Sequence, residues 1–222
     1  MSQIIQPHGN YQKLESYQNS VVIFDATCDF CTNFLKKSDR TIDQMIQAAR
    51  SGKQNIIEGS SASVISSETE IKLLGVARAS LEELLEDYRD YLRVHQLPLW
   101  KKDDPRIVPI RQLAKQKNKS YETYKTYLPS NNAELFCNAM ISLIHQTNYL
   151  LDRQLKSLAE SFAEKGGLRE RMYNAGVNNR NAKQEQVLSL LREIYREVAV
   201  SGNESLLKKI ENAANLLKDG KQ

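Results

Sequence analysis

The sequence predicts an all-α protein with one long helical domain and a helical C-terminal extension. Nine glycines and five prolines in 222 residues leave few points at which the backbone can turn, and these are the residue types that most often end helices and form turns. No alternating run of Val, Ile and Thr bounded by turn residues is sustained, so strands are not expected. Apolar residues three or four positions apart recur over long stretches, and this period favours amphipathic helices.

The first two long helices are expected at about residues 11–37 and 39–61. The first carries apolar residues at alternating steps of three and four, which places them on one seam of a helix. The second begins after Ser38 and Asp39, because a short side-chain oxygen accepts the free amide hydrogens of a first helical turn. The predicted seam of the first helix contains Leu14, Tyr17, Val21, Phe24, Cys28, Cys31 and Leu35.

A third and a fourth long helix are expected at about residues 67–95 and 132–164. Ser67 and Glu70 have the spacing of a reciprocal capping box at the start of the third, and a Gly-Gly pair ends the fourth. Four amphipathic helices must bury four apolar stripes, so an antiparallel up-and-down four-helix bundle is expected over residues 1–165. The two further stripes contain Leu74, Ala77, Leu81, Leu84, Tyr88, Tyr91 and His95, and Cys137, Met140, Ile144, Thr147, Leu151, Leu155, Leu158 and Phe162.

An insertion at residues 98–130 and a C-terminal suffix at 166–222 complete the expected architecture. Pro98 and Pro105 interrupt the helical pattern, because proline is excluded from a helix interior, and two short helices are expected in the insertion. The suffix opens with a polar stretch rich in Asn and Arg, which indicates a short helix and a connection. An amphipathic helical hairpin follows over about 187–217. It is too small to hold a core alone, so it is expected to dock on the bundle or on another subunit.

The net charge of +4 is small for this length and does not by itself indicate nucleic-acid binding. The charges are unevenly distributed, however, with seven basic residues against two acidic ones between Lys101 and Lys119. The N-terminus lacks a charged start followed by an apolar run, and no apolar stretch reaches the ~18 residues of a membrane span. We therefore expect a cytoplasmic protein that does not contact a membrane.

Metal, cofactor and catalytic motifs are not evident. Cys28 and Cys31 have the spacing that begins some zinc sites, but a second ligand pair is missing and both positions fall on the apolar seam of the first helix. The three histidines lie on separate elements, without a histidine or carboxylate at the spacing of a helical metal site. Phosphate-binding glycine loops and the nucleophile elbow are also absent. We expect neither a cofactor nor a metal.

The second helix carries an unusual face. Ala49 and Gly52 lie on its apolar side, where their small size lets a neighbouring helix approach closely, and Lys53 falls near the middle of that side. Three interpretations are open: packing, with Lys53 paired to Glu58 or to an acid of the third helix; a subunit interface; or contact of Arg50 and Lys53 with phosphate. On physical grounds, packing is favoured. The residues concerned are Gln44, Gln47, Arg50, Ser51, Lys53, Gln54, Asn55 and Glu58.

Three stretches carry a resemblance to a known family. They are DQMIQAARSGKQNIIEGS, SETEIKLLGVARASLEELLEDYRDYLR and the tryptophan of LPLW, which lie between about residues 11 and 100. Together they resemble the four-helix-bundle proteins encoded in intervening sequences of bacterial 23S ribosomal RNA genes. That family is similar in turn to the accessory variability protein of diversity-generating retroelements. The stretch GGLRERMYNAGVNN resembles the C-terminal suffix region of one subgroup.

The resemblance implies an up-and-down four-helix bundle that assembles into a homo-oligomer. The retroelement member is a ring-shaped homopentamer that binds nucleic acid and a reverse transcriptase through basic surface, whereas most other members have no established activity. This chain differs from that member by its small positive charge and by its insertion and suffix. The resemblance raises the expectation that the polar face of the second helix is a subunit interface, and it implies no catalytic residue.

The leading hypothesis is a non-enzymatic, oligomeric protein that binds RNA, DNA or a nucleoprotein partner. Arginine and lysine side chains contact phosphate groups, and tyrosines stack on unpaired bases. A solvated charged surface is the competing interpretation of the same residues. The candidate contacts are Arg106, Arg111, Lys115, Lys117 and Lys119, with Tyr121, Tyr124 and Tyr127 nearby, and in the suffix Arg169, Arg171, Arg180 and Lys183.

Two alternatives belong to other classes. Arg89 and His95 have the spacing of the arginine and histidine of some helical-bundle ribonucleases, in which the histidine moves the 2′-hydroxyl proton and the arginine steadies the phosphate. A partly buried histidine near the C-terminus of a helix is the simpler interpretation of His95. The other alternative is a scaffold that recruits a protein partner through the C-terminal suffix.

Overall fold

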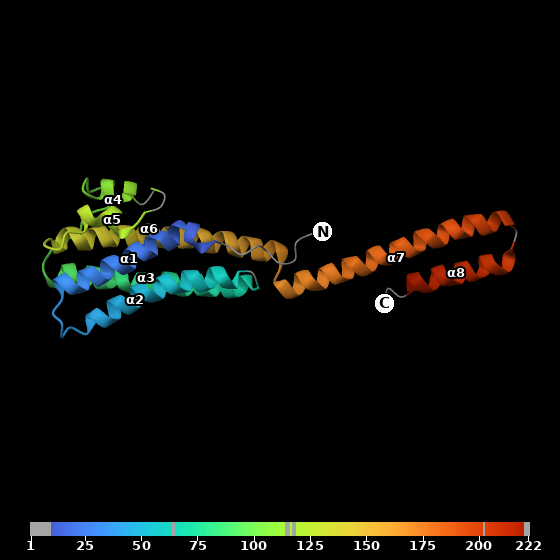
Figure 1. The fold of residues 1–222 in the computed structure, drawn as a ribbon, viewed down its shortest axis with the longest axis horizontal. Helices are drawn as coiled ribbons and strands as arrows, with labels where there is room; N and C mark the ends of the chain where they lie inside the picture. Colours follow the sequence, from blue (N-terminus) through green and yellow to red (C-terminus); the bar gives the residue numbers. More distant parts are fainter. Residues whose placement is uncertain (1–9, 64, 114–115, 117–118, 202, 220–222) are drawn as a thin grey trace. The chain divides into compact units, whose positions relative to one another are not determined.

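The computed structural model describes residues 10–63, 65–113, 116, 119–201 and 203–219 (Figure 1). Within these residues every regular element is helical, as predicted, and no strand is present. Each of these helices is too short or too polar to pass through a lipid bilayer. The chain divides into two compact units, Met1–Gly167 and Leu168–Gln222, which are called unit 1 and unit 2.

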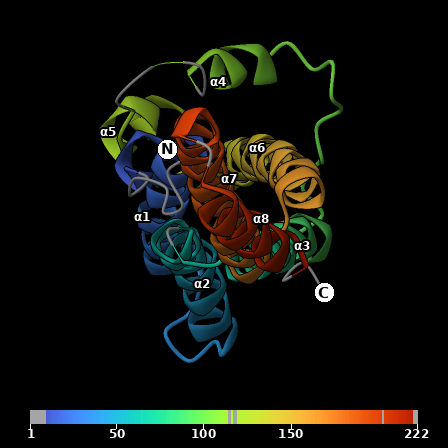
Figure 2. The same cartoon turned by 90° about the vertical axis from the view of Figure 1, so that its right-hand side faces the viewer.

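Unit 1 is built on four long helices. α2 packs along α3 and α3 along α6, while α1 lies against both α2 and α6, so each long helix contacts two others (Figures 1 and 2). The short helices of the insertion are placed outside this arrangement, with α4 on α6 and α5 on α1. The elements are η1 Tyr11–Lys13, α1 Glu15–Phe34, α2 Thr41–Ala62, α3 Ser67–Val94, α4 Ile107–Leu113, α5 Tyr121–Tyr124, η2 Lys125–Tyr127 and α6 Ala133–Lys165.

The core of unit 1 lies between the four long helices. Of the predicted stripe of α3, the residues from Leu74 to Tyr88 are fully buried, whereas Tyr91 is half-buried and His95 is exposed. The predicted stripe of α6 is buried from Cys137 to Leu151 and becomes progressively exposed towards Phe162. Burial of this size is the main favourable term for folding. The largest fully buried side chains are Tyr88, Tyr124, Phe30, Phe136, Ile23, Met45, Ile56, Leu74, Leu81, Leu84, Leu85 and Leu92.

The seam predicted for the first helix is wrong in its rotation. The buried face of α1 runs through Asn19, Ile23, Ala26 and Phe30, and most of the predicted seam lies on half-buried sides. Polar residues cause the difference, because Asn19, Ser20 and Thr27 are buried and break the apolar period that the sequence displays. The helix also begins later and ends earlier than 11–37, at Glu15 and Phe34, because the flanking residues Leu14 and Leu35 are extended.

Helix caps follow the predicted chemistry with one shift. The Asn132 side chain accepts a hydrogen bond from the Leu135 amide at 3.0 Å, and Gly166, with φ 66°, ends α6. Asp39 accepts from the Thr41 amide at 2.9 Å before α2. The predicted capping box at the start of α3 is wrong by one residue, because the residue that caps this helix is Ser66 and Glu70 is buried instead.

Unit 2 consists of α7, Leu168–Ser201, and α8, Glu204–Asp219, which pack against each other. The Leu206 amide donates to Asn203 Oδ1 at 3.2 Å, so Asn203 caps the first turn of α8. The predicted short helix and connection before the hairpin are replaced by one continuous helix. A single glycine, Gly176, costs a helix about 1 kcal/mol, and the asparagines here cost less, so the segment remains helical.

Candidate functional site

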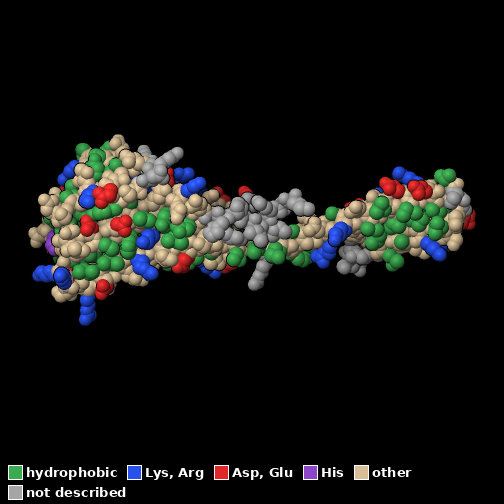
Figure 3. Space-filling model, viewed as in Figure 1, with side chains coloured by type: hydrophobic (Ala, Val, Ile, Leu, Met, Phe, Trp, Pro, Cys, Tyr) green, Lys and Arg blue, Asp and Glu red, His purple; other side chains and the backbone are tan. Residues whose placement is uncertain are grey.

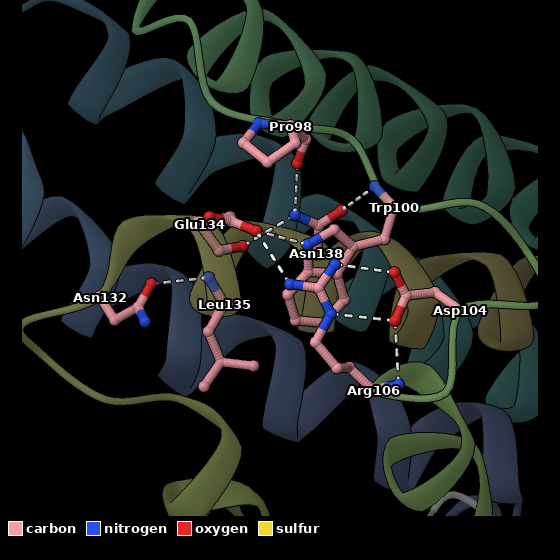
Figure 4. Close-up of polar contacts among 8 residues, drawn as sticks. All are labelled: Pro98, Trp100, Asp104, Arg106, Asn132, Glu134, Leu135 and Asn138. Atoms are coloured by element: carbon pink, nitrogen blue, oxygen red, sulfur yellow. Dashed lines mark hydrogen bonds and ion pairs between the residues drawn. The ribbon is translucent and has the colours of Figure 1, made fainter.

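A cluster of polar contacts fastens the start of the insertion to α6 (Figure 4). The Trp100 amide donates to Asn138 Oδ1 at 2.8 Å, and its indole Nε1 donates to Glu134 Oε1 at 2.6 Å. The Asn138 amide group donates in turn to the Pro98 carbonyl at 3.0 Å. Trp100 is therefore held at both its backbone and its ring, and we call this group of residues the Trp100 clamp.

Arg106 closes the Trp100 clamp on its outer side. Its guanidinium lies 3.8 Å from the centre of the Trp100 ring system and forms ion pairs with Asp104 at 2.8 Å and with Glu134 at 3.2 Å. The hydrogen bonds from Arg106 hold the pKa of the Asp104 carboxyl below its ordinary value. These contacts join the insertion to α6 within unit 1.

A pocket of about 580 Å³ lies beside the clamp, between α3, α6 and the segment that contains α4. Its walls are mainly apolar, and its volume is within the range of about 300–1,000 Å³ typical of small-molecule sites. Three cationic side chains and one histidine are part of the lining, which contains no carboxylate. The lining residues are Arg89, Leu99, Trp100, Lys102, Ile107, Arg111, Asn138, Ile141, Ser142, His145, Gln146 and Tyr149.

The electrostatics of the pocket are positive. Arg89 forms an ion pair with Glu86 at 2.5 Å, whereas Lys102 and Arg111 are in no ion pair within the described part of the chain. His145 Nε2 lies 3.1 Å from Arg89 Nη2. Burial lowers the pKa of His145, and the charges of Arg89 and Arg111 lower it further, so this imidazole is neutral near pH 7.

The predicted basic residues of the insertion that the structure describes lie in three different environments. Arg106 is held by the two carboxylates, Arg111 lines the pocket, and Lys119 is only 7% exposed, with burial lowering its pKa. Lys115 and Lys117 lie outside the described residues. On the face of unit 1 shown in Figure 3, Lys and Arg side chains are scattered and interspersed with Asp and Glu.

The three tyrosines proposed to stack on bases are committed to packing. Tyr124 is 1% exposed, and the Tyr121 hydroxyl donates to the Asp29 carboxylate. Tyr127 packs against the core from a half-buried position. Their rings therefore anchor the end of the insertion to unit 1, and the expectation that they stack on bases is wrong for Tyr124.

Two of the four basic residues predicted in the suffix, Arg180 and Lys183, lie close together on the first half of α7. Both are exposed, and the helical register places them on one stripe with Tyr173 and Gly176, within about 80° at 100° per residue. Tyr173 is 68% exposed. We call these four positions the α7 basic stripe; the side chains of the other two predicted residues, Arg169 and Arg171, lie outside the described part of the structure.

The α7 basic stripe precedes the part of α7 that packs on α8. The side chain of Gln184 contacts the Leu217 carbonyl, near the end of α8, so the hairpin contact begins close to this residue. Only one acidic residue, Glu170, occurs between Leu168 and Lys183 against four basic ones. The continuity of α7 brings the stripe into line, and the predicted break in the helix concealed that alignment.

Part of the polar face of α2 packs within unit 1. Lys53 places its ammonium 3.9 Å from the centre of the Phe24 ring, so its partner is an aromatic face and not Glu58. Ser51 bonds to Ser80 on α3 at 2.9 Å, and Asn55 donates to the Ser51 carbonyl at 2.9 Å. Gln54 is half-buried, whereas the remaining predicted interface residues, Gln44, Gln47, Arg50 and Glu58, are exposed.

The arginine and histidine of the ribonuclease alternative do not converge within one chain. Six positions along α3 rotate His95 about 120° away from Arg89. His95 is the exposed C-cap residue of α3 and stacks on the Tyr91 ring at 3.9 Å between centres, whereas Arg89 contacts His145. The sequence offered no signal for the Arg89–His145 contact, since the two residues are 56 positions apart on different helices.

The thiols are not suited to nucleophilic chemistry. Burial raises the pKa of Cys31 to about 12 and also raises that of Cys28 and Cys137, so all three remain protonated at neutral pH. Cys31 and Cys137 are core residues, as predicted for Cys31, and Cys28 is half-buried. Within the described residues no group of three or more potential metal ligands is present.

Comparison of the chain with protein-family models, with curated proteins and with solved structures finds no match. The resemblance to the proteins of 23S ribosomal RNA intervening sequences therefore stays a prediction. Three features of the described residues are candidate sites: the α7 basic stripe, the exposed residues of α2 and the cationic pocket.

Proposed function

We propose that this protein is a non-enzymatic nucleic-acid-binding protein and that it contacts single strands through the α7 basic stripe. The observation that carries the proposal is the alignment of Arg180 and Lys183 with the exposed Tyr173 on one side of an uninterrupted helix. Cations about one turn apart contact neighbouring phosphates, and an exposed ring on the same side of the helix stacks on an unpaired base.

Gly176 lies in the middle of the stripe and supports the same proposal. A Cβ atom added there would have no atom within 4 Å, so no packing contact in the described chain requires a glycine. The missing side chain leaves helix backbone accessible between Tyr173 and Arg180. A sugar-phosphate backbone approaches such a position more closely than it would a larger residue.

The architecture we propose for unit 1 is an antiparallel four-helix bundle formed by α1, α2, α3 and α6, of the type that the sequence resemblance implies. We further propose that the protein is a homo-oligomer, with a pentamer as the form implied by the resemblance. The polar face of α2 supports an interface between subunits. Ser51 and Asn55 on this face are already hydrogen-bonded within the subunit, whereas four further polar residues remain exposed and can contact a second copy: Gln44, Gln47, Arg50 and Glu58.

The test compares two double variants of α7 with the same change of charge. Arg180→Gln with Lys183→Gln removes two cations from the stripe, and Arg192→Gln with Arg196→Gln removes two exposed cations from another side of the helix. We expect the first to weaken binding of labelled single-stranded RNA at least tenfold in a mobility assay and the second to change it less than threefold. Equal loss in both variants would sink the proposal, because it would reflect net charge alone.

The RNA recovered from these mixtures is predicted to be intact, because Arg89 and His95 face different sides of α3. Cleavage that is lost in His95→Ala but not in His145→Ala would contradict the non-enzymatic proposal and favour the ribonuclease alternative. Cleavage that is lost in His145→Ala alone would also contradict the non-enzymatic proposal, and it would identify Arg89 and His145 as the reactive pair.

A protein-interaction scaffold is the second candidate function. Hydrophobic side chains gather over the α7–α8 hairpin (Figure 3), where Leu190, Ile194 and Leu206 are each more than 40% exposed. A partner protein that covers them should be lost in Leu190→Ser with Ile194→Ser while RNA binding persists. If RNA binding is absent and this variant loses a co-purifying protein, the scaffold function replaces the first proposal.

A further inference from the structure

We infer that the pocket between α3, α6 and the segment containing α4 binds a small organic anion. Its apolar body lies inside the pocket, and its carboxylate or phosphate group is held by Lys102 and Arg111, the two cationic side chains of the lining that are in no ion pair with a described residue. This site is separate from the α7 basic stripe, and the inference does not depend on nucleic-acid binding.

The pocket is built into the fold. One wall is the surface of α6 from Asn138 to Tyr149, and the facing wall is the segment from Leu99 to Arg111. The Trp100 clamp fixes the second wall to the first through the hydrogen bonds of Trp100 with Asn138 and Glu134. A binding site held in shape before its ligand arrives loses less entropy on binding, which favours affinity.

The charges of the pocket select an anion. Lys102 and Arg111 have no carboxylate partner among the described residues, whereas Arg89 is paired with Glu86 at 2.5 Å. The lining therefore has an excess of two positive charges. The facing groups are Glu82 and Glu86 on α3 and His145 on α6. Glu82 is occupied by Arg78 at 3.5 Å and by the Asn148 amide at 3.0 Å. His145 adds no positive charge when neutral, but its ring can donate or accept one hydrogen bond.

The remaining lining selects a ligand with an apolar body. Ile107 and Ile141 are buried, and Leu99 and Tyr149 are more than half exposed next to them. Polar contacts are few, because the Gln146 amide already donates to the Ser142 carbonyl at 3.2 Å. Inorganic phosphate alone would leave this apolar surface uncovered, so the class of ligand is an organic acid or an organic phosphate.

The experiment uses three optically silent probes with the same eight-carbon chain: octanoate, octyl phosphate and 1-octanol. Trp100 is the only tryptophan of the chain and lines the pocket, so its fluorescence reports occupancy in the full-length protein. The variant is Arg111→Gln, which removes a cation without disturbing an ion pair. Arg153→Gln on α6, an exposed arginine outside the pocket, is the matched control.

We expect both anions to shift the Trp100 emission saturably and more tightly than octanol. Arg111→Gln should weaken binding of both anions by about tenfold or more, the usual size of a contact with a charged group, and should leave octanol binding unchanged. Arg153→Gln should change the binding of none of the three probes. The order of the two anions then distinguishes a carboxylate ligand from a phosphate ligand. Absence of a saturable shift overturns the inference, as does octanol binding as tightly as the anions without any effect of Arg111→Gln.

This result is separable from the proposed function. Arg180→Gln with Lys183→Gln lies in unit 2 and should leave octanoate binding unchanged, whereas Arg111→Gln should leave RNA binding unchanged. Loss of octanoate binding in the α7 variant would contradict the assignment of the anion site to unit 1.

Discussion

Gly52 provides a direct test of how α2 packs on α3. A Cβ atom added at this position would lie 2.8 Å from Cδ2 and 2.9 Å from Cγ of Leu81, which is itself fully buried. Gly75 on α3 is the matched control, because a Cβ atom there would meet nothing within 4 Å. Both glycines lie inside helices, so Gly→Ala contributes the same gain in helix propensity at both, about 1 kcal/mol.

The difference between the two substitutions therefore isolates the clash. Overpacking a well-filled core typically costs about 1–3 kcal/mol, so Gly52→Ala should be less stable than Gly75→Ala by that amount. Guanidinium unfolding followed by Trp100 fluorescence measures it in unit 1, since that unit contains the only tryptophan. In a Leu81→Ala background the difference should vanish. If Gly52→Ala stabilises the protein as much as Gly75→Ala does, the close contact between α2 and α3 is wrong.

Three further predictions concern buried polar groups. Burial raises the pKa of Glu70 from 4.5 to about 7, so between these pH values the folded state keeps a proton that the unfolded chain releases. The free energy of unfolding should therefore fall by about 3 kcal/mol as the pH rises through this range, and Glu70→Gln should remove most of the decline. Urea unfolding at pH 5 and pH 8 measures it, and equal stability at the two pH values would refute the prediction. Asn138→Ala should shift Trp100 emission to longer wavelength at unchanged helical content, because the tryptophan loses its backbone partner, and unchanged emission would argue against the clamp. Thr27→Val should lower the melting temperature more than Tyr88→Phe does. The first change leaves the buried Tyr88 hydroxyl, 3.0 Å from Thr27 Oγ1, without a partner, whereas in Tyr88→Phe the Thr27 hydroxyl still donates to the Ile23 carbonyl. The reverse order in thermal unfolding would contradict this reasoning.

The local parts of the fold could be predicted from the sequence because their causes are local. Asn132, Asn203 and Gly166 cap helices through contacts within one turn, and the stripe from Leu74 to Tyr88 repeats at the period of a helix. The rotation of α1 could not be predicted in this way. Apolar residues occur on more than one of its sides, and only the packing of α2 and α6 around it decides that Asn19 faces inward.

The candidate sites depended on contacts that the sequence does not display. The pocket joins Arg89 to His145 and Trp100 to Glu134, pairs that are 56 and 34 positions apart. Basic residues that are close together in the sequence of the insertion lie in different environments in the fold. Arg106 forms ion pairs with Asp104 and Glu134, whereas Lys119 is buried. One feature of the sequence points to the Trp100 clamp: a single tryptophan lies in a polar connecting segment, where a large apolar ring usually packs against a neighbouring helix.

The salt dependence of RNA binding tests the central proposal most directly. Each phosphate contact on a single strand contributes about −0.7 to the slope of log K against log salt concentration. Arg180→Gln with Lys183→Gln should therefore make the slope shallower by about 1.4, and Arg192→Gln with Arg196→Gln should leave the slope of the unmodified protein. Identical slopes for all three proteins, or no binding at low salt, would contradict the assignment of phosphate contacts to the α7 basic stripe.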